Sequence, residues 1–327
     1  MSELNNIALK IIGNGKGILA ADESTGTMTK RLDSVNVQST PKNRLLFRET
    51  LFSSSSMTDC IGGVILYDET IRQLSSKKNK ITELISEMGS LPGIKVDTGA
   101  KVLAGSPNEK ITEGLDGLRE RLKEYYKIGA KFTKWRGVYV ISKDYPSKLS
   151  ISSNAHALAR YSALVQECNM VPIVEPEVLM DGEHSAEDCY EKTSNVIEKC
   201  FEELILHKVD LKGIILKPNM ILAGNMSKNK ITNNEVAKLT LKCLKKTSEV
   251  INKCFEELIL HKIDLSGIIL KPNMILAGSS SKNKISNEEV SEKTLECLKN
   301  SVPTEVPGIA FLSGGQSELE ATENLNL

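Results

Sequence analysis

Short apolar runs alternate with longer stretches of helical periodicity along the whole chain. Eight of these runs have the length and the glycine or polar boundaries that are typical of buried strands. They are Gly17–Glu23, Gly62–Glu69, Gly93–Thr98, Phe132–Val140, Val171–Val178, Gly213–Met220, Gly267–Met274 and Gly308–Gly314. Segments such as Ser194–Leu206 lie between them and place their apolar residues on one helical face. This strict alternation predicts a parallel α/β fold.

A closed (β/α)₈ TIM barrel is the leading expectation for eight such units, and we expect residues 1–327 to form a single domain. The alternative is a doubly wound open sheet. That fold usually carries a glycine fingerprint after its first strand, and the string GKGILAADES does not match GxGxxG. No linker divides the chain.

Residues 193–246 and 247–300 form a tandem repeat. About 41 of their 54 aligned positions are identical. Each copy contains one LKPNM string, so Lys217 and Lys271 occupy equivalent places at the ends of apolar strands. A lysine in such a place is a candidate covalent catalyst, and this chain has two candidates.

The overall composition excludes several classes of function. Lysine and arginine total 42, as do aspartate and glutamate, so the net charge of zero favours neither nucleic acid nor an anionic membrane as a partner. No apolar stretch reaches the length of a membrane span, and the polar start lacks the apolar core of a signal peptide. We therefore expect a cytoplasmic location.

Neither the cysteines nor the histidines predict a metal site. The seven cysteines include no CxxC pair, and the four histidines show no ligand spacing. We expect reduced thiols, no metal and no cofactor.

Charged residues gather where the predicted strands end. Three pairs are spaced two residues apart, which places both members of each pair on one face of a strand. They are Lys95 with Asp97, Lys134 with Arg136, and Glu175 with Glu177; Asp22 ends the first strand, and Lys217 with Asn219 ends the sixth. The carboxyl ends of all strands of a parallel barrel open on one mouth, so these side chains are expected to converge there.

Such a mixture of charges suits amine catalysis. A lysine beside other cations loses its proton more readily, and its free amine attacks a carbonyl to form a Schiff base. Neighbouring carboxylates such as Glu175 and Glu177 can carry protons. Surplus cations can hold substrate phosphate, and we expect Arg136 to do so. The string Ser313-Gly314-Gly315 follows a predicted strand and is typical of a phosphate nest of main-chain N–H groups.

At these residues the chain resembles class I fructose-1,6-bisphosphate aldolase, the metal-independent Schiff-base type. The resemblance runs from about residue 7 to the end. The strings that carry it are GKGILAADEST (15–25), IGGVILYDET (61–70), GIKVDTG (93–99), EGLDGLRER (113–121), KWR (134–136), ALARYSALVQECNMVPIVEPEVLMDG (157–182), LKPNM and PGIAFLSGGQSELEATENLN (307–326).

The resemblance implies a (β/α)₈ barrel that cleaves fructose 1,6-bisphosphate reversibly into dihydroxyacetone phosphate and glyceraldehyde 3-phosphate in glycolysis. It implies that the LKPNM lysine forms the Schiff base and that Glu175 is the acid/base, with Glu177 as its partner in the dehydration chemistry. Asp22 is similar to the residue that handles the C4 hydroxyl of the substrate.

The other positions follow by the same resemblance. Lys134 is similar to the lysine beside the Schiff base, and Lys95 to a member of the same charge network. Ser313 and Gly314 resemble a loop that binds one substrate phosphate, and Arg31 a contact near the other phosphate.

The chain departs from the family pattern at two places. It carries two LKPNM units where the family has one, and it ends at Leu327, where the family continues into a further strand with a phosphate-binding arginine and a tail with a catalytic tyrosine. Strands one to five, two copies of six, and seven would still make eight. In that order Lys217 lies beside the strand of Glu175 and is favoured; Lys271 is favoured if the first copy is displaced.

Two alternatives to this activity stay open at the level of sequence. One is a catalytically impaired, aldolase-like binding or assembly protein, and the other is an aldolase for a different phosphorylated sugar. As partners, the resemblance implies sugar phosphates, other copies of the chain in a homotetramer, and cytoskeletal proteins.

Overall fold

The computed structural model describes residues 2–229, 231–232, 235–240, 242–243, 269–270, 286–299 and 308–309. Three of the predicted site residues, Lys271, Ser313 and Gly314, lie outside the described residues. The statements below concern the described part of the chain.

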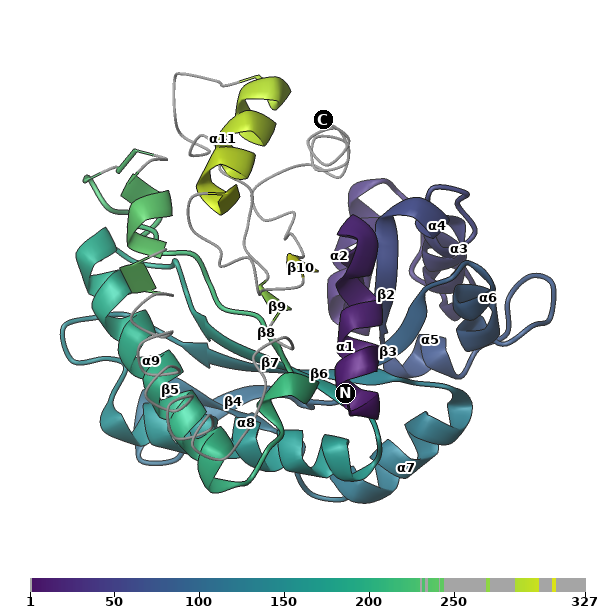
Figure 1. Cartoon of the computed structure of the whole chain (residues 1–327), viewed down its shortest axis with the longest axis horizontal. Helices are drawn as coiled ribbons and strands as arrows, with labels where there is room; N and C mark the ends of the chain where they lie inside the picture. The colour runs from purple at the N-terminus through teal and green to yellow at the C-terminus, as the bar shows by residue number, and fades with distance from the viewer. Residues whose placement is uncertain are drawn as a thin grey trace.

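A single parallel sheet forms the centre of the molecule, and its strands follow one another in chain order (Figure 1). The strands are β1 (Gly17–Ala21), β2 (Ile61–Leu66), β3 (Leu91–Lys95), β6 (Phe132–Tyr139), β7 (Val171–Val178), β8 (Ile215–Leu216), β9 (Ile269–Leu270) and β10 (Gly308–Ile309). Each predicted strand is thus confirmed, although most end earlier than expected. Sequential order is typical of a barrel, whereas a doubly wound sheet reverses its order at a switch point. The doubly wound alternative is therefore wrong.

The two ends of the sheet come close to each other around the molecule. In the described residues β1 pairs with β2 and β10 pairs with β9. The last strand, β10, also contacts the short 3₁₀ helix η1 (Gly13–Gly15), which leads directly into β1. The sheet is therefore curled, as a barrel requires.

Helices cover the outside of the sheet. The described ones are α1 (Glu3–Ile12), α2 (Thr25–Ser34), α3 (Pro41–Phe52), α4 (Met57–Cys60), α5 (Asp68–Ile71), α6 (Ile81–Glu87), α7 (Leu118–Ile128), α8 (Lys148–Glu167), α9 (Ala186–Leu206) and α11 (Asn287–Lys299), with η2 at Leu211–Gly213. Residues 235–240 and 242–243 are also helical. No helix in this part of the chain is long and apolar enough to cross a lipid bilayer.

The two longest helices begin at serine caps. The Ser147 hydroxyl accepts the N–H of Ser150 at the start of α8, and Ser185 forms a capping box with Asp188 at the start of α9. Such caps satisfy main-chain donors that have no partner within the helix. The two helices pack on each other and on β7, so they support the strand that carries Glu175 and Glu177.

An antiparallel hairpin that the sequence did not predict precedes α7. Its strands are β4 (Gly99–Leu103) and β5 (Ser106–Glu113). These segments are rich in polar residues and lack a buried apolar run, which is why pattern alone missed them. Thr112 fixes the hairpin to the barrel, because its hydroxyl donates to the Arg136 carbonyl at 2.6 Å and its N–H donates to the Asn154 side chain.

Helix α1 closes the barrel near the amino-terminal ends of the strands. One compact apolar cluster joins it to five strands and consists of Ala8, Ile11, Ile12, Ile18, Ile65, Phe132, Val171, Ile173 and Ile215. Glycines make room for its largest member, because a Cβ at Gly63 or Gly93 would meet the Phe132 ring at 3.0 or 2.4 Å. This apolar layer fills the barrel below the charged residues at the carboxyl ends of the strands.

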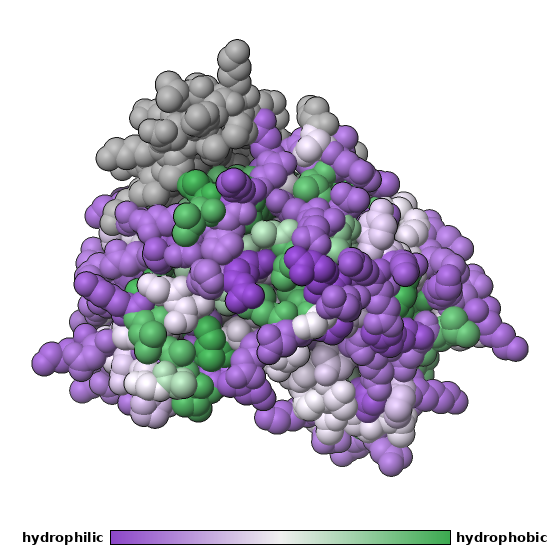
Figure 2. Space-filling model, turned by 90° about the horizontal axis from the view of Figure 1, so that it is seen from below, coloured by the Kyte–Doolittle hydropathy of each residue, from purple (hydrophilic) through white to green (hydrophobic). Residues whose placement is uncertain are grey.

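The charged residues continue the same strand faces. Along β6, Lys134 follows Phe132 by two positions, and Glu175 follows Ile173 in the same way on β7. Alternate residues of a strand share one face, so on β6 and β7 the inner face carries an apolar residue first and a charged residue two positions later. On the face of the molecule drawn in Figure 2, the coloured residues are mostly polar, with scattered apolar areas.

The contact between α1 and β2 leads to a stability prediction. A Cβ at Gly62 would lie 1.8 Å from the main-chain oxygen of Ile11, and main chain in a capped helix cannot move aside cheaply. We expect Gly62→Ala to lower the free energy of unfolding by at least ~2 kcal/mol, measured by chemical denaturation.

Gly26→Ala is the matched control for this variant. Gly26 lies in the first turn of α2, and a Cβ there would meet nothing within 4 Å. The control should be neutral or slightly stabilising. Equal stability of the two variants would contradict the close packing of α1 on β2.

Candidate active site

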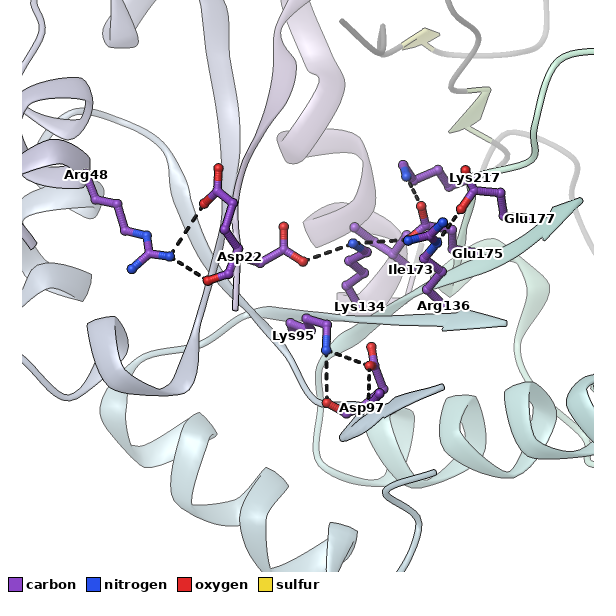
Figure 3. A network of polar contacts seen from close by, with 12 residues as sticks. Asp22, Arg48, Lys95, Asp97, Lys134, Arg136, Ile173, Glu175, Glu177 and Lys217 are labelled. Carbon is purple, nitrogen blue, oxygen red and sulfur yellow. Dashed lines mark hydrogen bonds and ion pairs between the residues drawn. The ribbon is translucent and has the colours of Figure 1, made fainter. Parts of the chain in front are cut away.

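Four charged side chains form a continuous chain across the carboxyl ends of the strands (Figure 3). The Lys217 ammonium donates to Glu175 Oε1. Lys134 lies between two carboxylates, with its Nζ 3.3 Å from Glu175 Oε2 and 2.9 Å from Asp22 Oδ2. The order of signs is therefore cation, anion, cation, anion.

All four groups are largely withdrawn from solvent. The side chain of Glu175 is 3% exposed, and those of Asp22, Lys217 and Lys134 are 10 to 12% exposed. Burying a lone charge costs several kcal/mol, so such groups persist inside a protein only when they are paired. Each ion here has an opposite charge beside it.

The strand order brings Lys217 to Glu175. Strand β8 pairs with β7, and the N–H of Lys217 donates to the Val174 carbonyl at 2.8 Å. The expectation that the first-copy lysine lies beside the strand of Glu175 is confirmed for the main chain and for the side chains.

Asn219, two residues after Lys217, holds this part of the chain to β7. Its Oδ1 accepts the N–H of Val178 at 3.0 Å, and its amide group donates to Thr193 on α9. The LKPNM segment is thereby fixed between a strand and a helix, although β8 itself has only two residues.

Lys95 and Asp97 form a separate ion pair of 2.6 Å below this chain of charges. Lys95 is level with Lys134 in the register of β3 and β6, so the two cations lie on neighbouring strands. The side chain of Asp97 is 4% exposed, and its Oδ2 has no hydrogen-bond partner within the described part of the chain.

Arg136 and Glu177 form the rim of the site. Arg136 Nε donates to Glu177 Oε2, and the two side chains are 41% and 32% exposed. They come from the same two strands as Lys134 and Glu175 but lie two residues nearer the carboxyl ends. A positive group at the open edge is suited to meet an anion that arrives from solvent.

Arg31 forms an ion pair with Glu23, the residue that follows Asp22 in the sequence. Its guanidinium lies 3.1 Å from Glu23 Oε1, and half of the side chain is exposed. Lys271, Ser313 and Gly314 are the only predicted site residues that the described structure does not reach.

Sequence reasoning missed two arginines of α3 that support the site from outside. Arg48 is buried, donates to the Glu23 carbonyl at 2.7 Å and to Thr70, and so joins the ends of β1 and β2. Arg44 forms a bidentate pair with Glu69 after β2. The available signal was their spacing of four residues, which places both on one helical face.

The ion pair between Arg44 and Glu69 also changes the pKa of Glu69. The hydrogen bond from Arg44 lowers the pKa of Glu69 below its ordinary value of 4.5, because it stabilises the charged carboxylate. Burial acts in the opposite direction but is the smaller effect.

This geometry provides the parts of a carbonyl-attacking site. It has a buried amine, a carboxylate in contact with that amine, a second carboxylate reached through Lys134, and cations at the rim. A base next to a lysine nucleophile can accept and return its protons. Within the described residues, the site has only lysine, arginine and carboxylate groups, with no imidazole or thiolate in the ion-pair network that would favour a transition metal.

Comparison with known proteins identifies relatives along the whole chain. The sequence model of the family described as fructose-bisphosphate aldolase class-I, glycolytic, matches residues 3–249 and 242–327. A probable fructose-bisphosphate aldolase class 1 of Xanthomonas campestris is 40% identical over 326 residues, which are 100% of this chain and 81% of the relative. The cytosolic fructose-bisphosphate aldolase 6 of Arabidopsis thaliana is 41% identical over 95% of this chain and 72% of its own length.

One solved structure supports the same relationship. The fructose-bisphosphate aldolase of Plasmodium falciparum, crystallised with TRAP and a small-molecule inhibitor, superposes with a TM-score of 0.75. It is 39% identical, and the match covers 99% of this chain and 78% of that one.

The Arg44–Glu69 pair predicts a pH-dependent contribution to stability. A carboxylate with a lowered folded pKa stabilises the folded state above its unfolded pKa and loses that effect as the pH falls through the folded pKa. We expect Glu69→Gln to be less stable than the parent chain by on the order of 1 kcal/mol at pH 7, with the difference shrinking below about pH 4.5. Denaturation curves at several pH values measure this.

Glu83→Gln is the control, because Glu83 pairs with Lys80 on the exposed surface at 3.3 Å. Surface pairs contribute ~0–1 kcal/mol, so this variant should follow the parent chain closely. A Glu69→Gln difference that grows as the pH falls would contradict the assignment.

Proposed function

The chain belongs to the class I fructose-bisphosphate aldolases, which are lyases, and we propose that its aldol cleavage proceeds through a Schiff base on Lys217. The single observation that carries this proposal is the contact between the Lys217 ammonium and Glu175 inside the buried chain of ion pairs. The substrate we propose is fructose 1,6-bisphosphate, and the products are dihydroxyacetone phosphate and glyceraldehyde 3-phosphate.

The reaction begins at the C2 ketone of the open-chain sugar. The free amine of Lys217 attacks this carbon, the adduct loses water, and a protonated imine forms. Loss of the C4 hydroxyl proton then breaks the C3–C4 bond, whose electron pair moves to the imine nitrogen and leaves an enamine. Glyceraldehyde 3-phosphate departs, C3 takes up a proton, and water releases dihydroxyacetone phosphate with the free lysine.

Glu175 and Asp22 are the proton carriers that we assign to these steps. Glu175 contacts the amine directly, so it can take the proton that Lys217 must lose and return one when water leaves. Asp22 lies at the other end of the ion-pair chain and is assigned to the C4 hydroxyl. Lys134 lies between them and forms an ion pair with each carboxylate.

The remaining predicted residues are assigned to binding and support. Glu177 assists the dehydration from the next inner-facing position on β7, and Lys95 adds positive charge below Lys134. Arg136 and Arg31 lie where the site meets solvent and are assigned to the substrate phosphates. Ser313 and Gly314 are proposed as a phosphate loop on the resemblance alone.

We also propose that the tandem repeat duplicates one βα unit within the barrel and that Lys271 is not the Schiff-base residue. Two observations support this. The family model matches twice, with the two matches overlapping at 242–249, where the first copy ends and the second begins. The main chain before Lys271 forms β9, which is one strand further from β7 than β8 is.

We also propose where the enzyme acts and what it assembles with. A cytoplasmic location agrees with the cytosolic description of the Arabidopsis relative. A homotetramer and a cytoskeletal partner rest on the resemblance; the Plasmodium relative has been crystallised with TRAP.

Reductive trapping tests the assignment of the lysine. Borohydride in the presence of dihydroxyacetone phosphate should attach the substrate to Lys217, and peptide mapping should find the label there. Lys217→Met removes the amine but keeps most of the side-chain volume, so labelling and cleavage should both disappear.

Lys271→Met is the matched control, because the same substitution is made in the second copy of the same string. It should retain labelling and activity. Label on Lys271 would transfer the assignment to the second copy, and no label on either lysine in a folded chain would favour the impaired binding protein.

The role of Glu175 predicts a different signature. Glu175→Gln keeps the shape of the side chain but cannot carry a proton, so the rate of cleavage should fall by about 10²–10⁴-fold. Single-turnover formation of the trapped adduct should slow as well, and steady-state kinetics with fructose 1,6-bisphosphate measure the loss.

Glu49→Gln serves as the control for a buried glutamate without a catalytic role, since Glu49 accepts hydrogen bonds from Ser76 on the outer side of the barrel. It should change the rate less than about tenfold. Similar losses in the two variants would show that Glu175 acts only through structure.

A further inference from the structure

A second polar cluster lies away from the barrel mouth, on the outer helices α8 and α9. His156 of α8 faces Glu203 of α9, and His207 follows α9 directly. One possible ligand atom from each residue lies within 4.8 Å of the other two. His156 Nδ1 is 3.2 Å from Glu203 Oε2, and the two imidazole rings are 4.9 Å apart at 72°.

Hydrogen bonds around the cluster orient Glu203 and His207. Lys199 occupies the other carboxylate oxygen of Glu203, at 3.1 Å, so Oε2 faces the histidines. His207 Nδ1 lies 2.8 Å from the Glu203 carbonyl oxygen. A histidine that donates one ring N–H to a carbonyl presents the lone pair of its other nitrogen, which is the usual arrangement around a bound metal.

We propose that His156, Glu203 and His207 bind one divalent transition-metal ion, with Zn²⁺ as the best chemical match. Two imidazoles and one carboxylate, with a water in the fourth position, are a common set for Zn²⁺. Bond lengths of about 2.0–2.1 Å in a tetrahedron place neighbouring ligand atoms about 3.3 Å apart, close to the spacing of His156 and Glu203.

The environment of the cluster favours a cation that comes from solvent. The side chain of His156 is half exposed, whereas that of Glu203 is 11% exposed.

Bound metal would join α8 to α9. Both helices pack on β7, which carries Glu175 and Glu177, so the ion would stabilise the outer support of the active site without touching the reacting groups. This site is independent of the proposed aldolase chemistry. The sequence did not indicate it because His156 and Glu203 are 47 residues apart.

Calorimetric titration of the full chain with Zn²⁺ alone tests the proposal. We expect one ion bound at this site, and His156→Ala should weaken its affinity at least about tenfold. Zn²⁺ should raise the thermal midpoint of the parent chain but not that of His156→Ala. Because His156 is half exposed, this variant should fold normally, and Glu203→Gln gives a second test that preserves side-chain volume.

His261→Ala is the matched control. His261 and Glu257 of the second copy repeat the spacing of His207 and Glu203, so the substitution removes the same residue type from the same local sequence. It should leave the affinity unchanged. Absorption spectra with Co²⁺ in place of Zn²⁺ distinguish metal bound at this cluster from metal bound by cysteines. Thiolate ligands give intense near-ultraviolet bands, and a histidine–carboxylate set does not.

Three results would overturn the proposal. They are no Zn²⁺ binding by the parent chain at millimolar metal, equal affinity in the parent chain and His156→Ala, and thiolate bands with Co²⁺. Loss of aldolase activity has no bearing on this test, so the two proposals fail separately.

Discussion

Pairing of buried charges is the constraint on which the rest of the site depends. Two lysines and two carboxylates lie within the barrel mouth, each largely shielded from water. A single buried charge at this place would have no partner to offset the free-energy cost of its desolvation. The alternation of signs from Lys217 through Glu175 and Lys134 to Asp22 gives each charge an opposite charge that offsets this cost, and it places an amine beside a proton acceptor. The same ion pairs therefore stabilise the buried charges and arrange the groups for the proposed reaction.

The surrounding fold holds these four groups in place from two directions. Below them, α1 and Phe132 fill the barrel with apolar side chains, so the charged layer has a rigid floor. Outside them, Arg48 of α3 ties the ends of β1 and β2 together through Glu23 and Thr70. A site built on strand ends is only as precise as these supports, since a small displacement would separate the ion pairs.

The tandem repeat places two copies of one strand in neighbouring positions of the sheet. Strands β8 and β9 have identical sequences and pair with each other, yet only β8 has β7 as its other neighbour. Identity of sequence therefore does not give identity of environment. Strand β7 carries Glu175, which contacts Lys217 of the first LKPNM unit. The strand of the second unit is not next to β7, so its surroundings differ.

The sequence by itself determined the alternation of strands and helices, the eight strands in chain order, and the charged types at their ends, because these depend on local periodicity along one chain segment. It also placed Lys217 next to the strand of Glu175. Only the tertiary structure decided which charges pair: Lys134 reaches Asp22 over 112 residues, whereas Lys95 binds Asp97 two residues away. The sequence also did not predict the hairpin of β4 and β5, the buried Arg48 or the cluster of His156, Glu203 and His207. Such contacts are set by barrel curvature and helix packing, which join segments that no local pattern relates.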